Sequence, residues 1–151
     1  MAVEVYIWLP KGQGFGHAAM KVTGGAPAGD VYMSRWPGYS LEAFVTGPGA
    51  AHRYEADVAA EGGPPRVVRL TKLDETAVKK AISELKTRNE YNFWTLNCCS
   101  QVKECLDAGI KGGTLFSWGL ILTTGGLVSY QAGNSPWGLL KYAQLVHATF
   151  G

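Results

Sequence analysis

The chain has 151 residues, a formal net charge of +2, 46% hydrophobic residues and 17% charged residues. This length and balance predict one globular domain with a single core, and they exclude a disordered chain. The small net charge, without a basic run interleaved with aromatic residues, argues against nucleic-acid binding. Three cysteines without regular spacing indicate neither a disulfide framework nor a zinc site, and we expect no cofactor.

The sequence pattern indicates neither a signal peptide nor a transmembrane segment. The first residues, MAVEVYIWLPKG, lack the basic and apolar regions of a secretory signal. The longest apolar stretch, 115–128, is too short to span a bilayer and is interrupted by Gly and Thr. If the protein acts outside the cell that makes it, we therefore expect a dedicated secretion system to export it, and otherwise we expect a cytoplasmic protein.

Four segments have the composition and alternation of β-strands. They are 3–9 (VEVYIWL), 17–22 (HAAMKV), 30–37 (DVYMSRWP) and 66–70 (RVVRL). A Gly-rich loop, 10–16, separates the first two strands. The stretch 47–65 contains GPG and GGPP and shows little periodicity, so we predict a surface insertion there.

Three helices are predicted after these strands. The first begins at Asp74, a typical N-cap residue, and has apolar residues at helical spacing up to Leu85. The second runs from about residue 97 to residue 108, with Gly109 just past its end. The last, 137–148, follows Ser135 and Pro136, which are typical of a helix start. Strands followed by helices, with one strand between, predict an α+β domain.

The start of the second helix carries two adjacent cysteines, Cys98 and Cys99. The unpaired N–H groups and the dipole of a helix N-terminus lower the pKa of a thiol, and the thiolate is the useful nucleophile. Cys98 falls in the first turn, with Asn97 as the expected N-cap. Cys99 and Cys105 are better explained as small core residues. The predicted inward face of this helix comprises Cys98, Val102, Cys105 and Leu106.

A nucleophilic cysteine needs a base, and the chain has three histidines. His52 lies in the Gly- and Pro-rich stretch, and His147 lies near a helix end, where an imidazole interacts favourably with the dipole. His17 begins a strand directly after the Gly-rich loop, where its ring can be held rigidly. We predict that Cys98 and His17 form a pair, although a strand-edge histidine bonded to the backbone would give the same pattern.

Together these motifs resemble the circularly permuted branch of the NlpC-type papain-like amidohydrolases, in which the His strand precedes the Cys helix. The resemblance rests on GHAAM (16–20), YMSRWP (32–37), YN-x4-NC-x3-V-x2-CL (91–106) and SPWGLLKYA (135–143), which cover less than half of the chain. Lecithin retinol acyltransferase-like proteins share the permuted order. The implied fold is α+β, with an antiparallel sheet carrying the His packed against a helix carrying the Cys, in one domain of residues 1–151.

The resemblance also implies roles for individual residues. The nucleophile falls on Cys98 and the general base falls on His17. The third residue, which orients the imidazole, falls on Ser34, where many relatives have His, Asn, Asp or Gln. Because a serine orients a ring weakly, the site would work nearly as a dyad, or another group would serve. The backbone N–H of Cys98 and one side chain would stabilise the oxyanion. The candidate substrate-binding residues are Asn92, Gln13 and Trp36.

Bacterial proteins with this pattern resemble type VI secretion effectors and related toxins. The implied activity is that of a cysteine amidase or endopeptidase that cleaves peptidoglycan stem peptides in a target-cell periplasm. The implied partners are peptidoglycan or another amide substrate, an immunity protein and a component of the secretion machinery. Two alternatives stay open. One is a lipid or acyl transferase or thioesterase, which the uncharged segment 112–140 favours unless that segment is buried. The other is a non-catalytic binding module.

Overall fold

The computed structural model describes residues 2–12, 14–24, 29–37, 46–47, 49–51, 53–88, 91–92, 97–111 and 135–151. Gln13, His52 and most of the uncharged segment, 112–134, lie outside the described residues. The described part is an α+β fold, as the order of strands and helices predicted. Among the described residues, no helix is long and apolar enough to cross a membrane.

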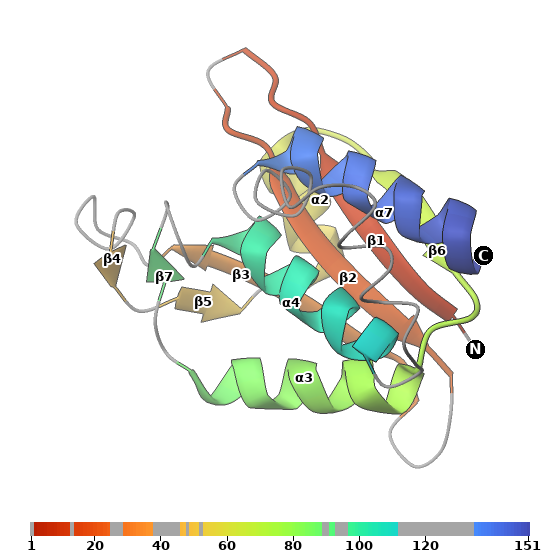
Figure 1. The fold of residues 1–151 in the computed structure, drawn as a ribbon. Helices are drawn as coiled ribbons and strands as arrows, with labels where there is room; N and C mark the ends of the chain where they lie inside the picture. The colour runs from red at the N-terminus through yellow and green to blue at the C-terminus, as the bar shows by residue number, and fades with distance from the viewer. Residues whose placement is uncertain are drawn as a thin grey trace.

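A five-stranded antiparallel sheet, in the order β5-β3-β2-β1-β6, forms the centre of the fold (Figure 1). Its strands are β1 (Ala2–Trp8), β2 (His17–Thr23), β3 (Val31–Pro37), β5 (Gly49–Ala51) and β6 (Arg66–Leu70). Two short strands, β4 (Thr46–Gly47) and β7 (Tyr91–Asn92), pair separately. The four predicted strands are confirmed.

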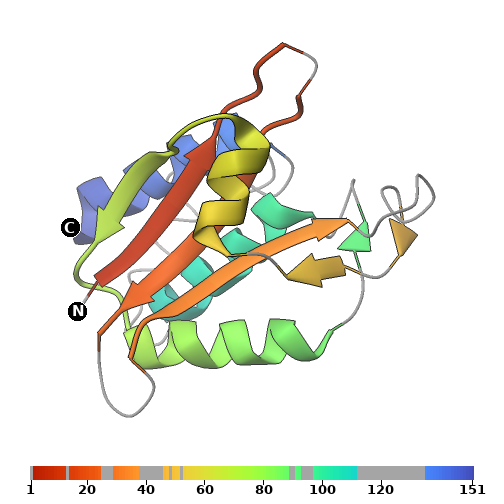
Figure 2. The ribbon, with the colours of Figure 1, turned by 180° about the vertical axis from the view of Figure 1, so that it is seen from behind.

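Helices cover both faces of this sheet. They are α2 (Tyr54–Glu61), α3 (Glu75–Thr87), α4 (Cys98–Lys111) and α7 (Pro136–Phe150). Figure 1 shows α3, α4 and α7 in front of the sheet, and Figure 2, seen from behind, shows α2 on the opposite face. The predicted N-caps are confirmed, because Asp74, Asn97 and Ser135 accept the N–H groups of Ala77, Ser100 and Gly138 at 2.9, 2.9 and 3.1 Å.

Alternation along the strands divides the buried side chains between the two faces. The larger core lies under α3, α4 and α7 and includes Val5, Met20, Val102 and Leu139. The smaller cluster on the α2 side comprises Tyr6, Trp8 and Ala19, with Tyr32 and Val58 against it. His17 lies opposite Trp8 in the register and therefore belongs to the α2 side. The predicted inward face of α4 is confirmed, since Cys98, Val102, Cys105 and Leu106 are all buried.

The prediction of a surface insertion at 47–65 was wrong. This stretch forms β5 and α2 and covers one face of the sheet. The sequence of α2 has no apolar stripe that would have predicted this helix. The residue that the helix buries is a carboxylate, Asp57. Gly62 ends the helix in the left-handed conformation, with φ of 76°, which suits the Gly-Gly pair that follows Glu61.

The prediction that Gly109 lies just past the end of α4 was also wrong, because the helix continues to Lys111. The glycine lies where α4 packs closely on α3. A Cβ atom at this position would be 2.7 Å from Cγ2 of Val78 and 3.3 Å from Cβ of Leu73. The small residue therefore serves helix packing rather than helix termination.

We expect Gly109→Ala to lower the free energy of unfolding. Overpacking a core typically costs about 1–3 kcal/mol, and better helix propensity returns about 1 kcal/mol. Urea unfolding of both proteins measures the difference. Gly63→Ala is the control, because a Cβ atom there meets nothing within 4 Å. A Gly109→Ala variant as stable as the parent would contradict the close approach of the two helices.

Candidate active site

The predicted pair meets where β2 and α4 both begin. α4 packs on β2, and each element starts with one member of the pair, His17 and Cys98. The imidazole and the thiol are within interacting range, and each shifts the pKa of the other. His17 belongs to the α2 side and Cys98 to the α4 side, so they meet at the strand end, where β2 no longer separates the two faces.

The surroundings of Cys98 lower the pKa of its thiol. A hydrogen bond from the neighbouring Cys99 is the largest cause that lowers the pKa of Cys98. Burial opposes this effect, but the His17 ring and the backbone N–H of Ala18 lower the pKa further, to well below its usual value. The position in the first turn of α4 also favours a negative charge. Cys98 is buried, with 9% of the residue exposed, against 2% for Cys99 and 0% for Cys105.

His17 is buried and tightly positioned. Its Nε2 atom lies 2.8 Å from Oγ of Ser34 and 3.6 Å from Oδ1 of Asp57. Its ring stacks on Trp36, with 4.2 Å between the ring centroids. Because Nε2 faces Ser34 and Asp57, Nδ1 is the nitrogen that remains for Cys98. Burial lowers the pKa of His17, but interactions with Asp57 and Cys98 outweigh burial and raise this pKa to about 9.

Asp57, which the sequence analysis missed, is the buried anion behind the ring. Its carboxylate is fully buried and accepts hydrogen bonds from Oη of Tyr32 at 2.5 Å and from Nε1 of Trp36 at 2.6 Å. Burial raises the pKa of Asp57, but interactions with His17, Ser34, Tyr32 and Trp36 together lower it to about 2. Several donors and a cation thus compensate a buried charge that would otherwise be very costly.

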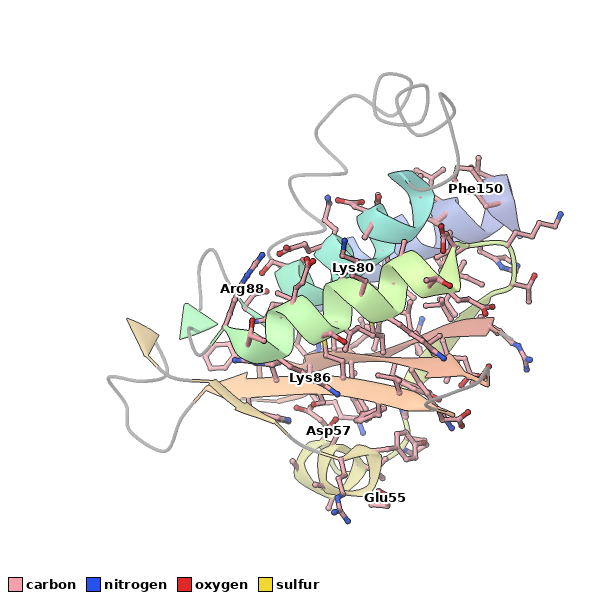
Figure 3. All side chains as sticks on the ribbon, turned by 90° about the horizontal axis from the view of Figure 1, so that it is seen from below. Glu55, Asp57, Lys80, Lys86, Arg88 and Phe150 are labelled. Carbon is pink, nitrogen blue, oxygen red and sulfur yellow. The ribbon has the colours of Figure 1, made fainter. Side chains whose placement is uncertain are left out.

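A signal for this carboxylate was present in β3. Tyr32, Ser34 and Trp36 alternate along the strand, so their three hydrogen-bond donors share the face that carries His17. Buried donors on one face require an acceptor. The sequence alone does not indicate which acidic residue supplies it. Figure 3 shows Asp57 on the side of α2 that faces the sheet and Glu55 on the far side.

The remaining predicted site residues differ in how they are placed. Ser34 is buried beside the His17 ring, as predicted, but the carboxylate of Asp57 supplies the charge that a serine lacks. Trp36, predicted to bind substrate, instead stacks on His17 and donates to Asp57. Asn92 lies in β7, opposite Thr46 of β4.

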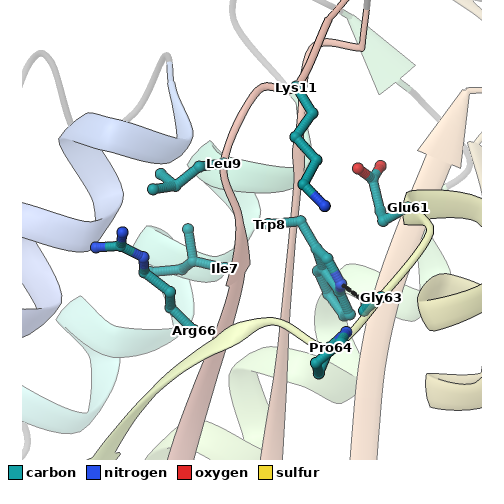
Figure 4. A pocket seen from close by; sticks show the side chains of 8 residues that line it. All are labelled: Ile7, Trp8, Leu9, Lys11, Glu61, Gly63, Pro64 and Arg66. Atoms are coloured by element: carbon teal, nitrogen blue, oxygen red, sulfur yellow. Dashed lines mark hydrogen bonds between the residues drawn. The ribbon is translucent and has the colours of Figure 1, made fainter.

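A cavity of about 210 Å³ is lined in part by Trp8, whose ring centroid lies 5.5 Å from that of His17 (Figure 4). Its charged lining residues are Lys11, Glu61 and Arg66. Burial raises the pKa of Glu61, and the charges of His17 and Cys98 act on it as well. Among the described residues, no group of three His, Cys, Asp or Glu side chains is arranged to hold a metal ion.

Comparison with known protein families, with curated proteins and with solved structures finds no match to this chain. Its function must therefore be inferred from the site itself.

Cys98 is expected to react with iodoacetamide at about pH 6 well before the other two cysteines, because the thiolate fraction and access set the rate. Burial raises the pKa of Cys105 to about 12, and the hydrogen bond to Cys98 together with burial raises the pKa of Cys99. Peptide mass spectrometry after short exposure identifies the labelled residue. Urea-unfolded protein, in which all three should react alike, is the control. Equal labelling in the folded protein would show that Cys98 is only a packing residue.

The free energy of unfolding is expected to stay nearly constant as the pH rises from 6.5 towards about 9, because the pKa shifts of His17 and Cys98 oppose each other. The pKa of His17 is about 9 in the folded protein against 6.5 ordinarily, so its stabilising proton is fully bound below pH 6.5 and is lost as the pH passes through the folded value. Taken alone, this loss corresponds to about 3 kcal/mol. The lowered pKa of Cys98 contributes stability that grows over the same range, because the unfolded thiol still holds its proton there. The lowered pKa of Asp57 also acts oppositely to that of His17, and its contribution is lost as the pH falls from 3.8 towards about 2.

Urea unfolding at about pH 6 and about pH 9 tests this dependence. The variant His17→Ala is the control, because only the lowered pKa of Cys98 then remains and stability should rise with pH over this range. A parent protein whose stability falls by about 3 kcal/mol over this range would contradict the lowered pKa of Cys98.

Proposed function

We propose that this protein is a cysteine hydrolase that cleaves amide bonds, with Cys98 as nucleophile and His17 as general acid and base. The observation that carries the proposal is that the His17 imidazole lies between the Cys98 thiol and the buried carboxylate of Asp57. Near neutral pH, the causes given above favour a thiolate beside an imidazolium, which a buried carboxylate holds from the other side. A packing cysteine and a satisfied core histidine would need none of these charges.

The reaction follows from these positions. The Cys98 thiolate attacks the amide carbonyl and forms a tetrahedral intermediate, whose oxyanion the free N–H groups of the first turn of α4 stabilise. The His17 imidazolium gives its proton to the leaving amine as the C–N bond breaks, which leaves a thioester on Cys98. Neutral His17 then takes a proton from water as the water attacks the thioester. Collapse releases the acid and restores the thiolate and the imidazolium.

Asp57 orients the ring during both steps. Its carboxylate lies on the Nε2 side of His17 and stabilises the imidazolium, while Ser34 contacts the same nitrogen. With Ser34 as the third residue, the sequence was also compatible with a binding module that has lost catalytic activity, because a serine orients an imidazole weakly. The buried carboxylate removes that argument and favours an enzyme.

The antiparallel sheet with His17 and the helix with Cys98 support the permuted papain-like architecture that the motifs resemble. On that resemblance we propose peptidoglycan stem peptides as the substrate, and an antibacterial effector exported by a dedicated secretion system and neutralised by an immunity protein in the producer. The cavity beside Trp8 presents both a carboxylate and cations, which suits the amino and carboxyl groups of a peptide.

Digestion of purified peptidoglycan tests the proposal. We expect soluble muropeptides with one new amino group per cleavage, and no release by Cys98→Ala. The matched control is Cys105→Ala, which removes a core thiol that contacts the Met33 sulfur instead of the site. Hydrolysis of acyl thioesters or lipids with intact peptidoglycan would favour the acyltransferase or thioesterase alternative. No turnover of either substrate class would favour the binding module.

Expression in bacteria tests the site of action. Protein directed to the periplasm should be toxic, and the same protein kept in the cytoplasm should not be. Toxicity that survives Cys98→Ala, or that arises only in the cytoplasm, would refute peptidoglycan as the target.

A further inference from the structure

The side chain of Cys99 lies close to that of Cys98, which is unusual for neighbouring residues of a helix. Consecutive residues of an α-helix point about 100° apart, so adjacent side chains do not normally face each other. Here the Sγ atoms of Cys98 and Cys99 are 4.0 Å apart, within the range of a sulfur hydrogen bond. Cys99 is only 2% exposed, so water does not compete strongly for this contact.

The surroundings decide which sulfur donates. Cys98 faces two groups that stabilise a negative charge, the His17 ring and the N–H of Ala18. For Cys99, all the causes that act on its pKa (the hydrogen bond and charge of Cys98, and burial) favour the protonated thiol. A thiol is a weak donor, but hydrogen bonds to an ionised acceptor are about twice as strong as neutral ones. The proton therefore belongs to Cys99 and the charge to Cys98.

We propose that Cys99 is a positioning residue that holds Cys98 in its reactive thiolate form by donating an S–H hydrogen bond. The role in catalysis rests on the proposed function, but the hydrogen bond itself does not. The bond is strongest to the free thiolate and weakens when Cys98 carries an acyl group. It therefore also favours departure of the Cys98 sulfur when water attacks the thioester.

Three variants at residue 99 separate hydrogen bonding from packing. Cys99→Ser keeps a hydroxyl donor, Cys99→Ala removes the donor, and Cys99→Val removes it while filling the core. The pH dependence of Cys98 alkylation by iodoacetamide is the readout, because its midpoint reports the pKa of the thiol and requires no substrate. A packing role alone would change stability in urea and leave this midpoint in place.

We expect the midpoint to rise by about one pH unit in Cys99→Ala and Cys99→Val, a roughly tenfold loss of alkylation rate below the midpoint. Cys99→Ser should stay close to the parent. If Cys99→Ala fails to fold, Cys99→Val carries the test. An unchanged midpoint in the apolar variants, or an equal shift in Cys99→Ser, would overturn the proposal. A shifted midpoint in a protein that hydrolyses nothing would support the hydrogen bond and refute only the proposed function.

Discussion

Replacing Cys98 by alanine is expected to lower amide hydrolysis by about three to six orders of magnitude, the usual loss when the nucleophile of a catalytic group is removed. No thioester can form without the sulfur, and His17 then has nothing to activate. The fold should survive, because the change removes one atom at the end of a helix whose N-cap, Asn97, stays in place. Rates on peptidoglycan and thermal unfolding of the two proteins measure both effects.

The control for this experiment is Cys105→Ala, which removes the same atom two turns along α4. That thiol is fully buried in the core, so its loss should lower stability by about 1 kcal/mol and leave the rate unchanged. If both variants lost activity equally, Cys98 would have a structural role only.

Replacing Asp57 by asparagine is expected to lower the rate by about 10²–10⁴-fold, the range expected when the group that orients a catalytic imidazole is neutralised. Burial alone lowers the pKa of His17, and Asp57 is the first of the interactions that outweigh it. Without the carboxylate the ring loses its proton near neutral pH, and the thiolate loses its cation. Because the amide keeps only one oxygen, its NH2 group also faces either Oη of Tyr32 or Nε1 of Trp36, each of which donates to one oxygen of Asp57.

Two comparisons make this prediction specific. Glu55→Gln neutralises the same charge on the outward side of α2 and should change nothing (Figure 3). Ser34→Ala should cost much less than Asp57→Asn, because the carboxylate still faces Nε2 of His17. A histidine pKa measured by NMR should fall in Asp57→Asn. An unchanged pKa with unchanged hydrolysis would remove Asp57 from the site.

Local patterns in the sequence predicted most of the fold. The alternation in β1 and β2, the caps at Asp74, Asn97 and Ser135, and the apolar spacing of α3 are short-range signals, and the structure confirms them. The pairing of Cys98 with His17 was predicted from chemistry, since a thiol at a helix start requires a base.

The roles of Asp57 and Gly109 were missed for the same physical reason. Each role depends on a residue that is distant in the sequence and close in space. Asp57 resembles any solvated acid until the donors on β3 are placed against it. Gly109 resembles a helix terminator until α3 is placed against α4. Spacing along the chain describes neither contact, so sequence patterns alone assigned both residues to the surface or to an end.

The position of Asp57 behind the sheet has a consequence for how the protein becomes active. Cys98 belongs to the α4 layer and Asp57 to the α2 layer, on opposite faces of the sheet. Packing of α4 alone therefore leaves the His17 imidazole without the Asp57 carboxylate. Docking of α2 alone leaves the imidazole without its thiolate. The three groups therefore come together only after both layers have packed on the sheet, and we expect an incompletely folded chain to be inert. If the proposed function holds, completion of folding is the step that assembles the catalytic group.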